Sequence, residues 1–356
     1  MRGRTTPGQA QEHQDAETPR RRDAARWLLT GATGFLGRHI LEDLNRQQHP
    51  PEIVALVRNP AEWSALDWIG PLRGVEPLAG DVTQLAARDS ALGARHPALG
   101  GILHLAAVVS NRRSDAERVH RVNVEGTLNL VRIAAQAGCR LVFVSTSGTV
   151  GCFREPGGSA DEEAGHREAE VRNWPYYRSK VIAEQRAALL ARELGVDLVI
   201  VRPPVLLGPG DHRHRSSAHV KRLLDGKVPF VIRGGMHYAD VRDVAAALVR
   251  LMELPQARPV YHLPGTQCSI EEFYRTVAEL AGVRPPRLVV PYRLAWAVAK
   301  LSAALGLSRF PEPALVEMAS RYWGMHSKYA GEIGYQSRPG RETLRDTIAW
   351  LRENPG

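Results

Sequence analysis

Residues 30–37 of the chain, TGATGFLG, decide its fold. A short apolar run at 27–29 precedes this glycine-rich stretch, and residues 35–45 after it carry apolar side chains at helical spacing. A strand, a glycine turn and a helix in this order bring backbone N–H groups close to a pyrophosphate at the helix N-terminus, where the helix dipole favours anions. The stretch therefore predicts a dinucleotide-binding loop, with cofactor contacts expected from Gly31, Thr33, Gly34, Phe35, Leu36 and Gly37.

Strand-like and helix-like segments alternate from residue 26 to about residue 203. We expect further helices at 115–137 and 176–194 and further strands at 52–57, 75–79, 101–107, 140–144 and 196–201. This alternation predicts an α/β fold, a doubly wound parallel sheet of the Rossmann type with helices on both faces.

The pattern loosens after about residue 203, where prolines and glycines become frequent. We expect a disordered basic tail at 1–25, a dinucleotide-binding Rossmann domain at 26–203, and a smaller C-terminal substrate lobe within 204–356. Segments at about 228–265 are expected to return to the Rossmann domain. The lobe should cover the mouth of the sheet, where ligands of such folds bind.

Composition excludes several classes of protein. The chain is 44% hydrophobic and 24% charged, which is typical of a soluble globular protein, and it has no apolar stretch long enough to cross a bilayer. Three widely spaced cysteines indicate reduced thiols and a cytoplasmic location. The net charge of +9 comes from scattered arginines, which favours a pocket for an anionic cofactor over nucleic-acid binding. His212 and His214 lack a third ligand nearby, so no metal site is expected.

Residues 293–306, RLAWAVAKLSAALG, form an apolar and mildly basic helical segment. We interpret it as a packing element of the C-terminal lobe. The alternative is a helix that lies on a membrane surface, which would matter if the substrate were a lipid.

Arg58 ends the second predicted strand, about 20 residues after the glycine loop. An enzyme that prefers NAD usually places an acidic residue here to hold the ribose 2′-hydroxyl, whereas a guanidinium suits the 2′-phosphate of NADP. The sequence therefore favours NADP(H), with NAD(H) possible and a solvated arginine at a strand end as the structural alternative.

Tyr176 and Lys180 lie four residues apart at the start of a predicted helix, so they share one face one turn apart. A neighbouring ammonium group is expected to lower the pKa of the tyrosine, which is near 10 when free. Tyr176 could then exchange a proton with a carbonyl or alcohol oxygen while a hydride moves. Tyr177 points about 100° away and is the weaker candidate.

The glycine spacing at 31–37, together with Tyr176 and Lys180, resembles the extended short-chain dehydrogenases/reductases, the NAD-dependent epimerase/dehydratase family. The resemblance covers nearly the whole chain from residue 26 and is strongest for dihydroflavonol-reductase-like and 3β-hydroxysteroid-dehydrogenase-like members. It implies an NAD(P)-dependent enzyme, a second role for Lys180 in holding the nicotinamide ribose, and a possible homodimer formed through helices.

The resemblance also implies roles for residues at the other strand ends. Asp81 and Val82 would contact the adenine ring, and the small residues of the run Leu105, Ala106 and Ala107 would let the backbone pass close to the cofactor. Pro203 lies where the family enters its substrate lobe and is also expected beside the cofactor. Asn123 would bridge the backbone and the active site, with a satisfied core amide as the alternative. For His104 we favour a purely buried strand position, and Asp240 could be a plain N-cap.

The predicted strand at 140–144 ends in Ser145, Thr146 and Ser147, at the edge where a parallel sheet presents its chemistry. A hydroxyl group here can stabilise charge on the substrate oxygen. Counting back from Gly151 as in the family makes Thr146 the catalytic hydroxyl, and a loop shorter by one residue would make it Ser147.

Three functions remain open from the sequence. The leading hypothesis is an NADP(H)-dependent reductase or dehydrogenase that acts on a ketone or secondary alcohol of hydrophobic or mixed character. The second is a nucleotide-sugar epimerase or dehydratase with tightly held NAD, and Arg58 counts against it. The third is a non-catalytic dinucleotide sensor, which the intact pair Tyr176 and Lys180 argues against.

Overall fold

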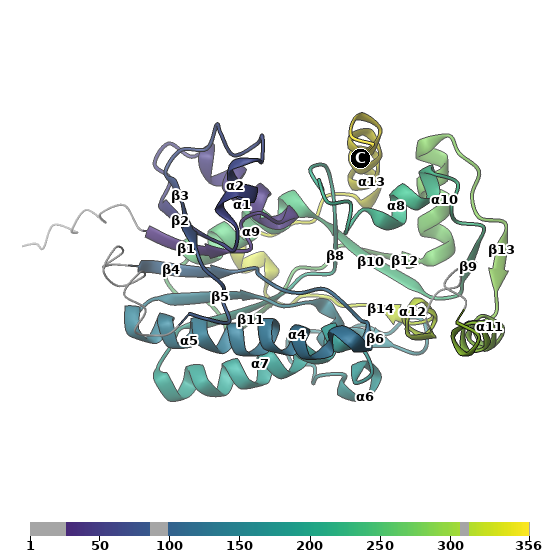
Figure 1. Ribbon diagram of the computed structural model, residues 1–356, viewed down its shortest axis with the longest axis horizontal. Coiled ribbons are helices and arrows are strands. Elements are labelled where there is room, and N and C mark those ends of the chain that lie inside the picture. The colour runs from purple at the N-terminus through teal and green to yellow at the C-terminus, as the bar shows by residue number, and fades with distance from the viewer. Residues whose placement is uncertain (1–25, 86–98, 307–312, 356) are drawn as a thin grey trace, which may run out of the picture.

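The computed structural model describes residues 26–85, 99–306 and 313–355 (Figure 1). The tail expected at 1–25 lies outside these ranges. A parallel seven-stranded sheet, in the order β11-β7-β5-β4-β1-β2-β3, forms the centre of the N-terminal part. Its strands are β1 (Arg26–Thr30), β2 (Glu52–Val57), β3 (Val75–Ala79), β4 (Leu99–His104), β5 (Arg140–Val144), β7 (Leu198–Arg202) and β11 (Val260–His262). The predicted doubly wound α/β fold is confirmed.

Helices cover both faces of this sheet (Figure 1). One face carries α1 (Phe35–Asn45), α2 (Pro60–Ser64) and α9 (Val241–Glu253), and the other carries α4 (Ala116–His120), α5 (Gly126–Ala137) and α7 (Pro175–Leu194). Successive residues of β1 enter the two cores, because strand side chains alternate. Leu29 packs in the core of α1 and α9, and Leu28 packs in the core of α5 and α7. Burial on both sides explains why the strands read as continuous apolar runs.

The helix expected at 115–137 is not a single regular helix. A 3-10 turn, η1 (Arg113–Asp115), precedes α4, and a π-helical turn, η2 (Arg121–Glu125), separates α4 from α5. Single π-turns of this kind are rare and frequently lie at functional sites. Here the turn contains Asn123, whose side chain is fully buried.

The C-terminal lobe is built on a three-stranded sheet in the order β12-β10-β8 and two short strand pairs, β13 with β9 and β14 with β6. Its strands are β6 (Cys152–Phe153), β8 (Val205–Leu207), β9 (Phe230–Ile232), β10 (Gly235–Asp240), β12 (Thr266–Ser269), β13 (Leu288–Val290) and β14 (Tyr322–Trp323). The other described helices and turns are η3 (Ser147–Thr149), α6 (Glu168–Val171), α8 (Ala218–Leu224), α10 (Ile270–Ala281), α11 (Tyr292–Ala304), α12 (Pro313–Ala319), η4 (Ala330–Ile333) and α13 (Gly340–Glu353). A separate core joins α10 and α13 through Phe273, Val277 and Leu344.

Helix α11 packs against the lobe through its small residues. Ala295, Ala299 and Ser302 are buried, whereas the large apolar side chains Leu294 and Leu301 are exposed. The interpretation of this segment as a packing element therefore accounts for its small-residue face only. Within the described ranges, no helix has the length and apolar character needed to cross a membrane.

Candidate active site

The loop between β1 and α1 has the shape expected of a phosphate cradle. Gly31 has a φ of +76°, and a Cβ atom on it would lie 2.9 Å from the backbone nitrogen of Ala106. A Cβ on Gly37 would lie 2.4 Å from the carbonyl oxygen of Gly31, so both positions require glycine. No described side chain caps α1, whose N-cap residue is Gly34. Its first N–H groups thus remain available, which fits the pyrophosphate of a dinucleotide.

The neighbouring strand ends hold this loop in place. The Thr30 hydroxyl accepts a hydrogen bond from the Ala106 backbone N–H at 3.2 Å and pairs with Nδ1 of His104 at 2.7 Å. His104 is buried between Thr30 and Thr127, and burial together with the charge of Lys180 lowers its pKa to about 3. The imidazole is therefore neutral, in accord with the structural role favoured for it.

The residues expected around the adenosine lie at the far strand ends. Arg58 follows β2 and is exposed. Asp81 accepts hydrogen bonds from the N–H and the hydroxyl of Thr83, each at 2.8 Å, and so closes the turn after β3. Val82 is buried against Gly126, where a Cβ would lie 2.7 Å from its methyl carbon. Phe35, Leu36 and Ala107 are half-buried along the same edge of the sheet.

Tyr176 lies in the first turn of α7, directly after Pro175, a residue suited to the first helical position. Burial raises the pKa of Tyr176 to about 12, and a side-chain hydrogen bond with Thr146 acts in the opposite direction. Thr146 is half-buried, whereas Ser147 is buried and donates its backbone N–H to the carbonyl oxygen of Pro203 at 2.8 Å. Of the two candidate residues, Thr146 is the one whose side chain forms a hydrogen bond with Tyr176.

Lys180 follows one turn later on α7 and is only 2% exposed. Its ammonium group donates to the carbonyl oxygen of Val144 at 2.8 Å and lies 4.6 Å from the centre of the Phe143 ring. Burial lowers the pKa of Lys180 to about 7, although the charge of Glu184 raises it. The sequence predicted that the ammonium would lower the pKa of Tyr176. Instead that pKa lies above its ordinary value, because burial outweighs the bond with Thr146.

A buried ionic cluster behind Lys180 was not predicted. Glu184, one further turn along α7, forms an ion pair with Arg202 at 2.6 Å and bonds with His166 at 2.8 Å, and the Ser145 hydroxyl also donates to it. Arg202 in turn contacts the ring of His262 at 3.2 Å. The spacing of Tyr176, Lys180 and Glu184 at intervals of four could have revealed that all three face the sheet.

Two asparagines tie the start of α7 to its surroundings. Asn123 exchanges hydrogen bonds with the backbone of Val108 at 2.8 and 3.0 Å and donates to the hydroxyl of Ser179 at 2.9 Å. Its amide is therefore satisfied and joins the loop after β4 to α7. Asn111, which sequence reasoning missed, accepts the backbone N–H of Tyr176 at 3.3 Å and donates to the sulfur of Met318 at 3.6 Å.

Tyr177 serves as a packing residue. Its ring stacks on Trp323 with centroids 5.2 Å apart, and a Cβ on Gly148 would lie 2.1 Å from it. This placement agrees with the weaker standing of Tyr177 as a proton donor. It also joins α7 to β14 of the C-terminal lobe.

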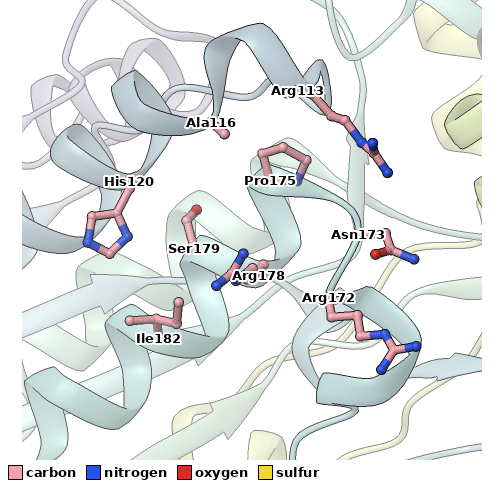
Figure 2. Close-up of a pocket in the computed structure, with 9 residues that line it drawn as sticks. All are labelled: Arg113, Ala116, His120, Arg172, Asn173, Pro175, Arg178, Ser179 and Ile182. Atoms are coloured by element: carbon pink, nitrogen blue, oxygen red, sulfur yellow. The ribbon is translucent and has the colours of Figure 1, made fainter.

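A cavity of about 470 Å³ lies beside the first turns of α7 (Figure 2). Its lining includes Arg113, Arg172 and Arg178, together with His120 and Ile182. Arg178 and Ile182 lie on the opposite face of α7 from Tyr176 and Lys180, so this cavity is separate from the proposed catalytic pair.

Asp240 has a structural role as the cap of a helix. It caps α9 by accepting the N–H of Arg242 at 2.9 Å and is also paired with the Arg242 guanidinium. Among the described residues, no group of three or more His, Cys, Asp or Glu side chains comes together as a metal site.

Comparison with known proteins agrees with this geometry. The family model described as NAD dependent epimerase/dehydratase family matches residues 27–263. Sterol demethylase protein B of Methylococcus capsulatus is 30% identical over 340 residues, which cover 92% of this chain and 98% of that protein. Dihydroflavonol 4-reductase of Zea mays is 31% identical over 251 residues, 66% of this chain and 68% of that protein. The crystal structure of gox2253 superposes with a TM-score of 0.78 at 28% identity, over 93% of this chain and 98% of that one.

Proposed function

Because the chain belongs to the NAD-dependent epimerase/dehydratase family and is an NAD(P)-dependent enzyme of the extended short-chain dehydrogenase/reductase type, we propose that it interconverts a ketone and a secondary alcohol. The observation that carries this proposal is the side-chain hydrogen bond between Tyr176 and Thr146, which lies at the carboxyl end of β5. Tyr176 shares one face of α7 with Lys180. The nicotinamide, when bound, would supply or accept the hydride.

In this proposal, the residues of the chain handle the proton and the charge on the substrate oxygen. The Tyr176 hydroxyl donates its proton to the carbonyl oxygen in reduction and takes it back in oxidation. The Thr146 hydroxyl donates a hydrogen bond to the same substrate oxygen and stabilises its developing charge. Lys180, positioned by the carbonyl oxygen of Val144 one turn from Tyr176, would hold the nicotinamide ribose. Asn123 holds the start of α7 through Ser179 and thereby positions Tyr176.

The test is a pair of matched variants, Tyr176→Phe and Tyr177→Phe, each of which removes one hydroxyl and keeps the ring. We expect Tyr176→Phe to lower kcat for reduction of a carbonyl panel by about 100- to 10,000-fold while cofactor affinity is retained. Tyr177→Phe should keep most of the activity, because that ring only packs on Trp323. Full turnover by Tyr176→Phe would overturn the proposed mechanism. Absence of turnover by the wild-type protein on the whole panel would instead favour a dinucleotide sensor.

We further propose that the cofactor is NADP(H), on the evidence of Arg58 at the end of β2. Its guanidinium is exposed at the strand end where a 2′-phosphate would be recognised. We expect NADPH to bind more tightly than NADH, and Arg58→Glu to weaken NADPH binding by about 10- to 100-fold without a comparable effect on NADH. Fluorescence titration measures the dissociation constants of NADPH and NADH for both proteins. Equal loss of both affinities would contradict the assignment.

The proposed substrate is hydrophobic or of mixed character. The two relatives named above act, by their names, on a sterol and a dihydroflavonol, and these names guide the choice of carbonyl panel. The alternative is an NAD-dependent nucleotide-sugar epimerase or dehydratase. It would be supported if NAD remained bound through purification and a nucleoside diphosphate sugar were converted without added cofactor.

The proposed location is a reducing cytoplasm. Burial raises the pKa of Cys139 to about 11 and that of Cys152 to about 12, so both thiols are poor thiolates. Such thiols suit an enzyme that keeps its cysteines reduced.

A further inference from the structure

Helix α11 shows an inverted distribution of side chains. Its large apolar residues Leu294, Leu301 and Leu305 are 57%, 62% and 63% exposed, while the residues that it buries are two alanines and a serine. A helix that packs on a core normally buries its largest apolar residues. Packing within the protein therefore does not explain why α11 carries so many large apolar residues.

The exposed residues form one continuous stripe. Leu294, Val298, Leu301 and Leu305 recur at intervals of four, three and four, which places them on one face of the helix. The stripe borders an apolar groove of about 210 Å³ between α11, β9, β13 and α12, and the exposed strand residues Leu288 and Val289 extend the same apolar surface. We call this set the α11 face.

The chain segment that carries the α11 face has positive charges and no carboxylate. No aspartate or glutamate occurs between residues 280 and 311, whereas Arg284, Arg287, Arg293 and Lys300 do. All four are exposed, and none forms an ion pair with another described residue. Glu317 of the neighbouring α12, whose charge acts on Tyr292 at the start of α11, is paired with Arg321 at 2.9 Å. Lys300 lies 5.1 Å from the centre of the Trp296 ring, and Trp296 is itself exposed. Trp296 lies on the side of α11 opposite the leucine stripe, so the indole is not part of the α11 face. Exposed leucines flanked by cations outside ion pairs are typical of a helix that lies in the interface of an anionic bilayer.

We propose that the α11 face docks the protein on an anionic lipid surface. The leucine stripe and the ends of β13 enter the boundary of the acyl chains, and Arg287, Arg293 and Lys300 remain at the lipid phosphates. This docking depends on surface chemistry alone and not on the proposed reaction.

Helix α12 places the α11 face close to the catalytic residues. Val316 of α12 packs on Ala295 and Ala299, and Met318 of the same helix packs with the cluster of Trp174 and Tyr177. Figure 1 shows α12 beside α11 and β14. A lipid surface at α11 is thus one helix away from Tyr176, which suits a substrate that dissolves in the bilayer.

The first test is cosedimentation of the full chain with phosphatidylcholine vesicles that contain about 30% phosphatidylglycerol. We expect binding by the wild-type protein, and a loss of at least about tenfold for the double variant Leu301→Glu/Leu305→Glu. Leu189→Glu is the matched control, because Leu189 is 66% exposed on α7, far from the α11 face. Wild-type protein that stays in the supernatant, or a double variant that binds like the control, would overturn the proposal.

The second test concerns charge. Arg293→Gln and Lys300→Gln should each weaken vesicle binding by about fivefold, and raising the salt from about 0.1 M to about 1 M should weaken it further. Arg186→Gln and Arg192→Gln on α7 should change it little. Gel filtration without lipid provides the rival outcome. If the wild-type protein is a dimer and the Leu301→Glu/Leu305→Glu variant is a monomer, the α11 face binds a second copy and the lipid proposal is wrong.

Discussion

Helices α7 and α11 both depart from the rule that apolar side chains face inward, but they depart in opposite ways. Helix α7 buries Lys180 and Glu184 and leaves Leu189 exposed. Helix α11 buries only small residues and exposes its leucines. In α7, each buried charge has a partner within the protein, namely the carbonyl oxygen of Val144 for Lys180 and the guanidinium of Arg202 for Glu184.

The difference is that the unusual residues of α7 find partners among the described residues of the protein, whereas those of α11 do not. A buried charge destabilises the fold unless it is paired, so the partners of Lys180 and Glu184 are needed to keep α7 stable next to the candidate catalytic residues. An exposed leucine stripe costs much less, because apolar atoms make up much of any protein surface. The exposed stripe of α11 thus persists without a partner inside the protein, and α11 should matter for binding more than for stability.

The largest effect on stability is expected from Glu184→Ala. Burial raises the pKa of this carboxyl, but the charge of Arg202 and the bonds with His166 and Arg202 outweigh it and hold the pKa at about 2. Removing the carboxylate leaves a buried guanidinium unpaired, which should lower the free energy of unfolding by about 3–5 kcal/mol. Urea denaturation at neutral pH measures the change.

The pH dependence of the Glu184→Ala effect provides an internal control. The stabilisation from the carboxylate is complete above its unfolded pKa of 4.5 and is lost as pH falls through about 2, so the gap between wild type and variant should close in that range. Glu332→Ala, which breaks an exposed pair with Arg258, should leave stability nearly unchanged. A gap that stayed constant down to pH 2 would mean that the carboxylate does not act through its charge.

A smaller effect of opposite sign is expected from Lys180→Met. Burial depresses the pKa of Lys180 to about 7, so the folded state disfavours the proton that the unfolded chain retains up to about pH 10.5. The variant should abolish activity and yet gain about 1–3 kcal/mol of stability at pH 6, after the loss of the bond to Val144 is included. The gain should shrink as pH rises from about 7 to about 10, because the wild-type lysine then folds uncharged. Lys227→Met, which removes an exposed ammonium group, is the control for the loss of a lysine. A loss of stability at pH 6 would contradict this account.

Local patterns predicted the frame of the sheet closely. The helix at 35–45 and the strands at 52–57 and 75–79 lie at the predicted residues. Their limits are set by nearby glycines, prolines and caps, which a sequence displays directly. The glycine loop was predicted for the same reason, and the structure adds the close approach of Gly31 to Ala106.

Features that depend on distant partners were not predicted. The π-turn around Asn123 depends on bonds to Val108, and the cluster at Glu184 joins α7 to β7 through Arg202. The spacing of Glu184 from Lys180 indicates that its side chain faces the sheet, but no local pattern identifies Arg202 or Val108 as a partner. The sequence of α11 shows that the segment is apolar but not which of its faces meets the protein. The catalytic roles of Tyr176, Lys180 and Thr146 stay predictions until variants are assayed.

The smallest effect on stability is expected at the α11 face itself. Leu301→Ala should change the free energy of unfolding by no more than about 0.5 kcal/mol, because the side chain is exposed. The same substitution at Leu344, fully buried in α13 of the same lobe, should cost about 2–5 kcal/mol. Urea denaturation of both variants without lipid makes the comparison. If Leu301→Ala cost as much as Leu344→Ala, the leucine would be packed against protein in solution, and the contrast between α7 and α11 would disappear.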